Sequence, residues 1–281
     1  MQHTMSLIEL SKWPTSDRAQ IQGVLTDIDD TLTTDGAITP DALAALARLR
    51  QAGLPVFAIT GRPARWSEGF ALSWPIDAIV AENGAVALSR GADGRLLKRY
   101  LQDPSTRQSN YRQLQAVLQH IENVMPQARR ATDSAGRETD IAIDHSEFSH
   151  LGTHDIAQVV KRMQEGGLHA TVSSIHINGW IGHHDKLAGA RWIIREDLGR
   201  DVDQELHRWV YVGDSTNDAR MFGHFPHSVG VANVARFVHQ LEHLPKYQAS
   251  SERGAGFTEV VNAVLAARCA ALPISRARKR V

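Results

Sequence analysis

Apolar and polar positions follow two different patterns along the chain, and the first is typical of parallel strands joined by helices. A short apolar run at Gly23–Thr26 leads into an acidic turn, and a second run lies at Pro55–Ile59. Between them, Thr39 can cap a helix that has Pro40 at its first position and that ends at Gly53. A strand, a helix and a second strand at this spacing predict parallel pairing with a right-handed crossover.

The same pattern returns late in the chain. Further apolar runs lie at Ile79–Val80, Trp209–Val212 and Val229–Ala232, and helix-like segments flank the last two. These runs predict an α/β fold whose core is a doubly wound parallel sheet. Because the runs lie on both sides of the middle region, we expect both ends of the chain to build that sheet.

The middle of the chain has the second pattern, which predicts an insertion. It contains two helix-like segments, two strand-like segments and a hairpin turn, at residues 107–124, 153–165, 141–143, 170–174 and 90–94. Helices and strands are mixed here without regular alternation, which is typical of α+β structure. We therefore predict a discontinuous core of residues 1–85 and 181–281, with an inserted α+β cap at residues 86–180.

Composition limits the class of protein. The chain has 281 residues, of which 42% are hydrophobic and 22% charged, so it can bury a sizeable core without disulfides. Its one cysteine, Cys269, fits a reducing compartment. The first twenty residues contain no apolar run of signal-peptide length, and no run anywhere is long enough to span a membrane. We expect a cytoplasmic protein without a membrane partner.

Charge gives no sign of a nucleic-acid partner. The chain has 31 basic and 31 acidic residues, so its formal net charge is zero. The basic residues gather only in the tail, at Arg276, Arg278, Lys279 and Arg280, and we interpret this segment as a solvated end.

Acidic turns follow two of the predicted core strands. Asp27 and Asp29 come directly after Gly23–Thr26, and Asp214 and Asp218 come after Trp209–Val212. Ligands of open α/β sheets bind beyond the carboxyl ends of the strands. Four carboxylates gathered there would repel one another unless they hold a cation, and Mg²⁺ prefers oxygen ligands. The sequence thus predicts a magnesium site.

Two simpler interpretations of these turns exist, of which the first stays open and the second fails on spacing. Either turn could merely cap the helix that follows it. A calcium-binding loop that starts at Asp27 is excluded, because its sixth position would be Leu32 instead of glycine and its twelfth Ile38 instead of glutamate.

Groups that suit phosphate lie at the same predicted edge. Thr60 follows the Pro55–Ile59 strand and can donate to a phosphoryl oxygen, and Gly61 lets the backbone approach closely. Lys186, at the return into the core, offers a positive charge. The chain has no G-x-x-x-x-G-K-[ST] motif and no G-x-G-x-x-G after a strand, so P-loop and dinucleotide sites are not expected.

The end of the insertion suggests residues that could set specificity. Ile175 to Asn178 alternates like a strand, which places His176 and Asn178 on one face. That face could bind sugar hydroxyls, with Arg62 and Arg65 supplying charge from the core side. The alternative is that the two polar side chains face solvent.

Together these segments resemble the haloacid dehalogenase-like hydrolases. The family's first motif, D-x-D-x-T, matches Asp27, Asp29 and Thr31, and its second and third motifs match Thr60 and Lys186. Its fourth motif, G-D-x-x-N-D, is matched by Gly213, Asp214, Asn217 and Asp218. All four motifs occur in order, and they cover the predicted core.

The resemblance implies roles for these residues. Asp27 is expected to attack phosphorus and form an aspartyl-phosphate, while Asp29 protonates the leaving oxygen and later activates water. Magnesium would be held by Asp27, the backbone carbonyl of Asp29 and Asp214. Asp218 would orient Lys186 or a metal-bound water. Phosphate would be bound by Thr60, Gly61, Lys186 and Asn217.

The insertion resembles the cap of the Cof-type subfamily, which includes sucrose-phosphate and mannosyl-phosphoglycerate phosphatases. Glu82–Ala85 resembles that subfamily's junction between core and cap, and Ser228–Asn233 resembles its segment after the fourth motif. The candidate specificity residues are Arg62, Arg65, Asn83, His176 and Asn178.

The expected protein is a Mg²⁺-dependent phosphatase for a small phosphomonoester, such as a sugar phosphate, and a monomer or homodimer. A phosphomutase on the same scaffold is one alternative, and the release of inorganic phosphate would distinguish the two. A signalling receiver domain also uses Asp, Thr and Lys around magnesium, but it is about half this length. A non-catalytic phosphate-binding protein is a third alternative, although every catalytic position is filled.

Overall fold

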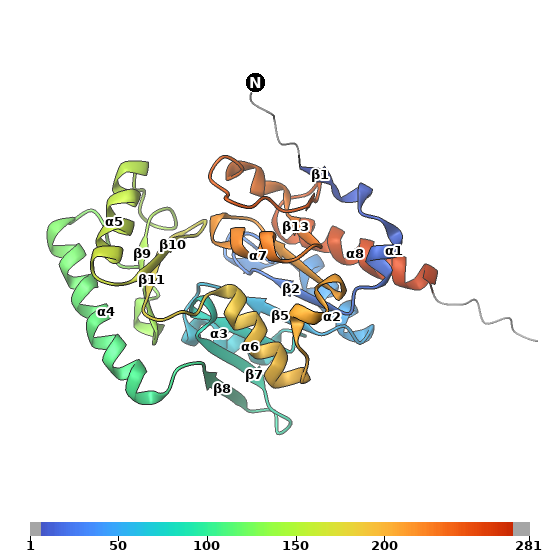
Figure 1. Cartoon of the computed structure of the whole chain (residues 1–281), viewed down its shortest axis with the longest axis horizontal. Coiled ribbons are helices and arrows are strands. Elements are labelled where there is room, and N and C mark those ends of the chain that lie inside the picture. The colour runs from blue at the N-terminus through green and yellow to red at the C-terminus, as the bar shows by residue number, and fades with distance from the viewer. Residues whose placement is uncertain (1–6, 272–281) are drawn as a thin grey trace, which may run out of the picture.

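The computed structural model describes residues 7–271, so the basic tail lies outside the described residues. Its centre is a sheet of nine strands (Figure 1). In spatial order the strands are β1 (Ile8–Glu9), β14 (Tyr247–Gln248), β13 (Ser228–Gly230), β12 (Trp209–Gly213), β2 (Gly23–Thr26), β5 (Val56–Ile59), β6 (Ala78–Ala81), β7 (Val86–Arg90) and β8 (Leu96–Tyr100). Pairing is parallel from β1 to β6 and antiparallel from β6 to β8.

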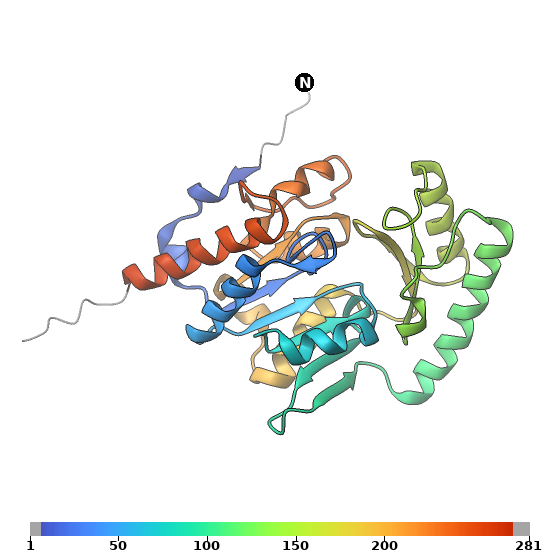
Figure 2. The ribbon, with the colours of Figure 1, turned by 180° about the vertical axis from the view of Figure 1, so that it is seen from behind.

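Helices cover both faces of this sheet, which explains why its central strands are apolar throughout. One face packs on α2 (Pro40–Gln51), α3 (Ala64–Ser73) and α8 (Arg253–Ala271), and the other on α6 (Lys186–Leu198) and α7 (Ala219–His224) (Figures 1 and 2). Alternate residues of β2 serve the two faces, with Val24 in one hydrophobic cluster and Leu25 in the other. The doubly wound core that the sequence predicted is confirmed. A short helix, α1 (Thr15–Ala19), precedes β2.

A second, smaller body of structure lies beside the carboxyl ends of the central strands (Figure 1). It has an antiparallel sheet in the order β10 (His169–Val172), β11 (His176–Trp180) and β9 (Asp140–Asp144). Helices α4 (Pro104–Val124) and α5 (Thr153–Glu165) pack on that sheet through their own hydrophobic cluster. We call residues 104–180 the cap. A two-stranded hairpin, β3 (Thr33–Thr34) and β4 (Ala37–Ile38), lies on the core side.

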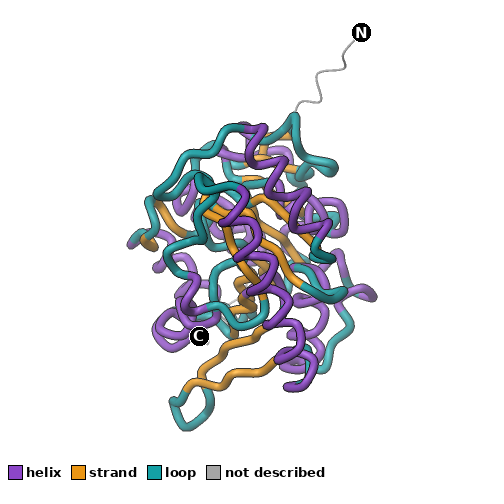
Figure 3. The backbone as a smooth tube through the Cα atoms, turned by 90° about the vertical axis from the view of Figure 1, so that its left-hand side faces the viewer, coloured by secondary structure: helices purple, strands orange, loops and turns teal. Residues whose placement is uncertain are grey.

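One assignment made from the sequence needs correction. The hairpin of β7 and β8 was predicted as part of the insertion, whereas β7 pairs with β6 and so extends the core sheet. Figure 3 shows this hairpin projecting from the body of the molecule. The turn at Arg90–Gly94 was recognisable, but a local pattern does not reveal which strand a hairpin joins. Apart from this shift of the first boundary, the division into two domains stays a prediction.

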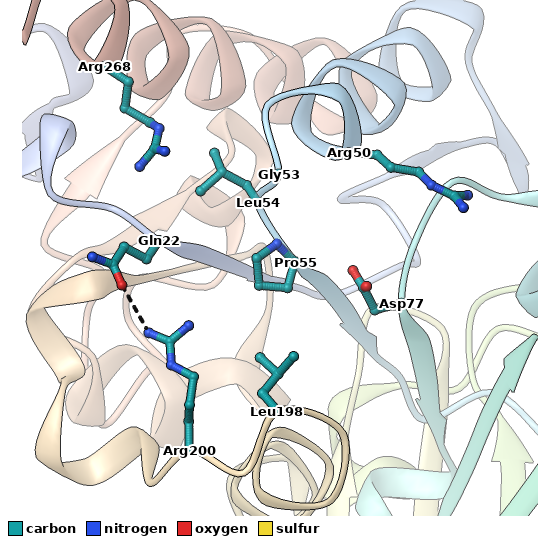
Figure 4. A pocket seen from close by; sticks show the side chains of 9 residues that line it. All are labelled: Gln22, Arg50, Gly53, Leu54, Pro55, Asp77, Leu198, Arg200 and Arg268. Carbon is teal, nitrogen blue, oxygen red and sulfur yellow. Dashed lines mark hydrogen bonds between the residues drawn. The ribbon is translucent and has the colours of Figure 1, made fainter. Parts of the chain in front are cut away.

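A pocket lies at the edge of the sheet opposite the cap, and the positions of helix C-termini explain why arginines line it. It has a volume of about 560 Å³ and lies where β2 and β5 begin (Figure 4). Arg50 and Arg268 lie in the last turns of α2 and α8, and Arg200 follows the end of α6. Cations are favoured at these helix C-termini. Arg200 also donates to the side chain of Gln22 at 3.2 Å.

No helix in the described residues combines the length and the apolar character that a membrane crossing requires.

Candidate active site

The acidic turns lie side by side because their strands are neighbours. β12 pairs in parallel with β2, and Asp27 donates its backbone N–H to the carbonyl of Val212 at 2.9 Å. Ligand atoms of Asp27, Asp214 and Asp218 all lie within 4.8 Å of one another, and the three side chains are buried. We call these three residues the core carboxylate cluster.

Lys186 is the cation that faces this cluster. Its Nζ donates to Asp27 Oδ1 and to Asp218 Oδ1, each at 2.7 Å. Lys186 opens helix α6, which packs closely on the junction at Gly84. Gly84 has φ +106°, and a Cβ there would lie 2.1 Å from the carbonyl oxygen of Asp185, so only glycine permits this approach.

Asp218 has its hydrogen-bonding capacity filled by protein groups. Oδ1 accepts from Lys186 and from the hydroxyl of Tyr211, and Oδ2 accepts from the backbone N–H groups of Asp214 and Ser215 at 2.9 and 3.1 Å. These contacts suit a residue that orients Lys186 better than one that binds a metal directly. Tyr211 had not been singled out, because it lies within an apolar strand and fits the pattern of a core residue.

Asp214 is held by two further polar side chains. Its Oδ1 accepts from Thr31 Oγ1 at 3.3 Å, and its Oδ2 accepts from Asn233 Nδ2 at 3.0 Å. Asn233 also donates to the carbonyl of Asp30, which has a φ of 53°. The sequence placed Asn233 in a segment that resembles the family but assigned it no role. The positive φ of Asp30 is a left-handed backbone conformation, and the hydrogen bond from Asn233 to its carbonyl holds it beside Asp214.

The charges of the core carboxylate cluster are not balanced by the protein. Burial raises the pKa of Asp27 to about 7, against the opposing effect of Lys186. Burial also raises the pKa of Asp214 well above its usual range, and the neighbouring Asp218 and Asp27 add to the effect. Three carboxylates and one lysine leave a deficit that a divalent cation would offset. The oxygen-only donor set fits Mg²⁺.

The groups expected to bind phosphate include residues that follow the two strands beside β2. Thr60 follows β5, the other neighbour of β2, and its Oγ1 accepts from the backbone N–H of Arg62 at 3.0 Å. The carbonyl of Gly61 accepts from Asn178 Nδ2 at 3.2 Å, so this residue also contacts the cap. The Asn217 side chain is half-buried and accepts from the hydroxyl of Ser215 at 3.0 Å.

Asp29 does not join the core carboxylate cluster with its side chain. Both of its carboxylate oxygens accept from Nε of Arg62, at 2.9 and 3.1 Å. The structure therefore turns the side chain of Asp29 towards the cap, whereas the sequence grouped it with the other three aspartates. Its expected contribution to the metal site was the backbone carbonyl, which this contact leaves available.

Four of the five candidate specificity residues gather where core and cap meet, and all four are buried: Arg62, Asn83, His176 and Asn178. The alternative in which His176 and Asn178 face solvent is wrong. Asn178 and Asn83 both donate to Asp140 Oδ2, at 3.1 and 3.2 Å. Arg65 differs from the other four because its side chain is exposed.

Several charged residues of this junction were missed in the sequence. Arg137 donates to both oxygens of Asp140 and of Asp133, and Arg62 donates to Asp133 and Glu147. We call these five residues the cap–core network. Apart from Arg62, which the sequence had already singled out, they are single charged positions without a regular spacing, so no local pattern marked them.

Comparison with known proteins agrees with this geometry. Residues 24–129 match the sequence model of a family described as haloacid dehalogenase-like hydrolase. This match covers the first two motifs, and the structure brings all four motifs to one edge of the sheet. Over residues 24–129 the chain is therefore similar to the haloacid dehalogenase-like hydrolases. No curated protein matches the chain.

Solved structures with a similar fold cover most of the chain. A Thermoplasma acidophilum protein is 18% identical with a TM-score of 0.67, covering 87% of this chain and 98% of its own. A putative HAD/COF-like hydrolase from Plasmodium vivax is 16% identical with a TM-score of 0.65, covering 90% and 99%. The sucrose-phosphatase of Synechocystis is 16% identical with a TM-score of 0.62, covering 87% and 98%. At these identities the likeness establishes the fold.

Proposed function

We propose that this protein is a Mg²⁺-dependent phosphatase that acts on a small phosphomonoester through an aspartyl-phosphate at Asp27. The observation that carries the proposal is the surplus of negative charge around Asp27. A buried carboxylate that contacts one lysine and lies beside two further carboxylates is incomplete without a divalent cation and well placed to attack phosphorus.

The chain's own residues supply the steps of the reaction. Asp27 Oδ attacks phosphorus, and the bond from phosphorus to the ester oxygen breaks. The departing oxygen takes its electron pair and a proton from Asp29, which then removes a proton from the water that hydrolyses the aspartyl-phosphate. Lys186 and Thr60 offset the charge that develops on the phosphoryl oxygens.

Asp27, the backbone carbonyl of Asp29 and Asp214 would hold the magnesium ion. The bound ion would supply positive charge beside the phosphoryl oxygens. Asp218 keeps Lys186 pointed at Asp27, since both Lys186 contacts are made by the same ammonium group.

We infer a phosphorylated sugar as the substrate class. The amides, histidine and arginines between core and cap are of kinds that bind hydroxyls, although in this structure they hydrogen-bond to carboxylates of the cap–core network. The solved structure of the Synechocystis sucrose-phosphatase contains sucrose and phosphate, which makes a sugar ester a sensible first choice. We further propose a cytoplasmic monomer or homodimer that needs neither nucleic acid nor a membrane.

Release of inorganic phosphate tests this function. The purified protein should hydrolyse members of a panel of phosphosugars and aryl phosphates with Mg²⁺ present, and chelation should abolish the activity. Transfer of the phosphoryl group to a second sugar hydroxyl, without free phosphate, would instead identify a phosphomutase. No turnover of any ester with Mg²⁺ present would contradict the proposal.

A further inference from the structure

Arg62 joins the core aspartate Asp29 to the cap. From the core loop after β5, its Nε donates to both oxygens of Asp29 at 2.9 and 3.1 Å. From the same guanidinium, Nη2 donates to Glu147 Oε1 at 2.9 Å. Arg62 is 6% exposed, so these charge-assisted contacts lie away from bulk water. The cap residue thus fixes the direction of the guanidinium that holds Asp29.

Glu147 is itself held firmly. It lies in a loop whose backbone is organised by Asp144, which accepts from the N–H groups of residues 146, 147, 148 and 149 at 2.9 to 3.1 Å. Glu147 Oε2 lies 3.0 Å from Nε2 of His176. The hydrogen bond to His176 and the charge of Arg62 lower the pKa of Glu147 to about 2, so the carboxylate is ionised at neutral pH.

We propose that Glu147 is a positioning residue, which through Arg62 aligns Asp29 with the leaving group only when the cap is seated on the core. This inference rests on the proposed function and adds to it a link between cap closure and proton transfer. The link has a physical basis, since a planar guanidinium fixed at one end by Glu147 has little freedom left at the end that contacts Asp29.

A second contact between cap and core offers a matched comparison. Glu138 of the cap accepts from Lys98 Nζ and from the hydroxyl of Tyr100, each at 2.7 Å, and both donors lie on β8. Glu138 therefore also anchors the cap, but its partners do not contact Asp29. If Glu147 only held the cap in place, losing either glutamate would have the same consequence.

The step that should respond is proton donation by Asp29. When the bond between phosphorus and the ester oxygen breaks, an alkoxide or phenoxide leaves with the electron pair and takes the proton of Asp29. A leaving group of low pKa needs no such proton. Misalignment of Asp29 should therefore slow the hydrolysis of esters with poor leaving groups and leave the hydrolysis of esters with good leaving groups nearly unchanged.

Single-turnover kinetics on substituted phenyl phosphates can test the proposal, with enzyme in excess and Mg²⁺ present. For Glu147→Gln we expect the release of phenol from phenyl phosphate to slow by about tenfold, with about twofold or less for 2,4-dinitrophenyl phosphate. Glu138→Gln should leave both rates within about twofold of the wild type.

Two further variants protect the test against a simple folding defect. Arg62→Lys keeps the charge but loses the fork that spans Glu147 and Asp29, so it should show the same dependence on the leaving group. Adding Glu147→Gln to Arg62→Lys should cause no further loss, because both act through one link. Far-ultraviolet circular dichroism confirms that each variant is folded.

The outcomes separate this inference from the proposed function. Equal losses across the phenyl series, or equal effects of Glu147→Gln and Glu138→Gln, would overturn the positioning role while the phosphatase assignment stands. A wild-type protein that releases no phosphate from any ester would instead remove the proposed function.

Discussion

The core carboxylate cluster and the cap–core network lie on either side of Asp29 and meet their negative charge in different ways. In the core carboxylate cluster, Lys186 alone faces three buried carboxylates. In the cap–core network, Arg62 and Arg137 pair with the carboxylates, and two asparagine amides also donate to Asp140. Every carboxylate of the cap–core network contacts an arginine, whereas Asp214 of the core carboxylate cluster contacts no cation among the described residues. A buried carboxylate without a counter-ion indicates a missing ligand.

The largest effect should come from the nucleophile. Asp27→Asn keeps the shape of the side chain but removes the attacking charge, so we expect kcat to fall by at least about a thousandfold. Asp35→Asn, on the exposed part of the following loop, should leave kcat unchanged within about twofold. Near-normal turnover of purified Asp27→Asn protein would remove the active site from this cluster.

Loss of an arginine from the cap–core network should instead lower the free energy of unfolding. Arg137→Met leaves the buried Asp140 and the half-buried Asp133 with fewer partners, and breaking the buried pair with Asp140 costs about 3–5 kcal/mol. In urea unfolding, the control variant Arg191→Met, which breaks an exposed pair with Asp203, should cost about 1 kcal/mol or less. Similar costs for the two variants would show that Arg137 does not stabilise the cap–core network.

Added Mg²⁺ should stabilise only through the core carboxylate cluster. At a concentration one hundred times its dissociation constant, a bound ion contributes about 2.7 kcal/mol, seen as a higher Tm. Asp214→Asn should abolish this rise, whereas Asp133→Asn, in the cap–core network, should retain it. A rise of equal size in both variants would contradict the assignment of the metal site.

This stabilisation should grow with pH. Burial raises the pKa of Asp27 from 3.8 to about 7 in the folded protein. Without the ion, the contribution of Asp27 to the free energy of unfolding is therefore fully present below pH 4 and is lost as the pH rises through 7. Mg²⁺ binds the ionised form, and the rise in Tm should therefore be larger at pH 8 than at pH 5. A rise that is independent of pH would contradict this interpretation.

The smallest effects should separate Asn178 from Arg65. Asn178→Ala removes one of the two amides that donate to Asp140 Oδ2, at an expected cost of about 1–2 kcal/mol in urea unfolding. Arg65→Ala changes an exposed side chain and should cost no more than about 0.5 kcal/mol. If either variant changes the ranking of phosphosugars by kcat/KM, that residue contacts the substrate.

The core of the site could be predicted because each motif is local and follows a strand. Asp27, Thr60 and Asp214 each end one of three adjacent parallel strands, so their convergence follows from the topology. The doubly wound core follows from the same runs. Nothing comparable exists for Glu147, whose partner Arg62 is distant in sequence, or for the contact of Arg137 with the carbonyl of Gly61. The pairing of β7 with β6 was missed for a different reason, because the two strands are close in sequence but the turn at residues 90–94 does not reveal which strand its hairpin joins.

The side chain of Asp29 is an instructive intermediate case. Its position after β2 was predictable, but its direction depends on Arg62, and the direction of Arg62 depends on the cap. Local pattern determines where such a residue lies along the chain. Tertiary contacts determine what its side chain binds.

In the proposed mechanism, Asp27 carries the phosphoryl group during turnover. The most direct measurement is rapid acid quenching of the enzyme with Mg²⁺ and a substrate that it hydrolyses, followed by peptide mass spectrometry. We expect a peptide containing Asp27 that is heavier by one phosphoryl group, and we expect this species to be lost in Asp27→Asn. Hydrolysis at full rate with the added mass on another residue, or on none under single-turnover conditions, would contradict it.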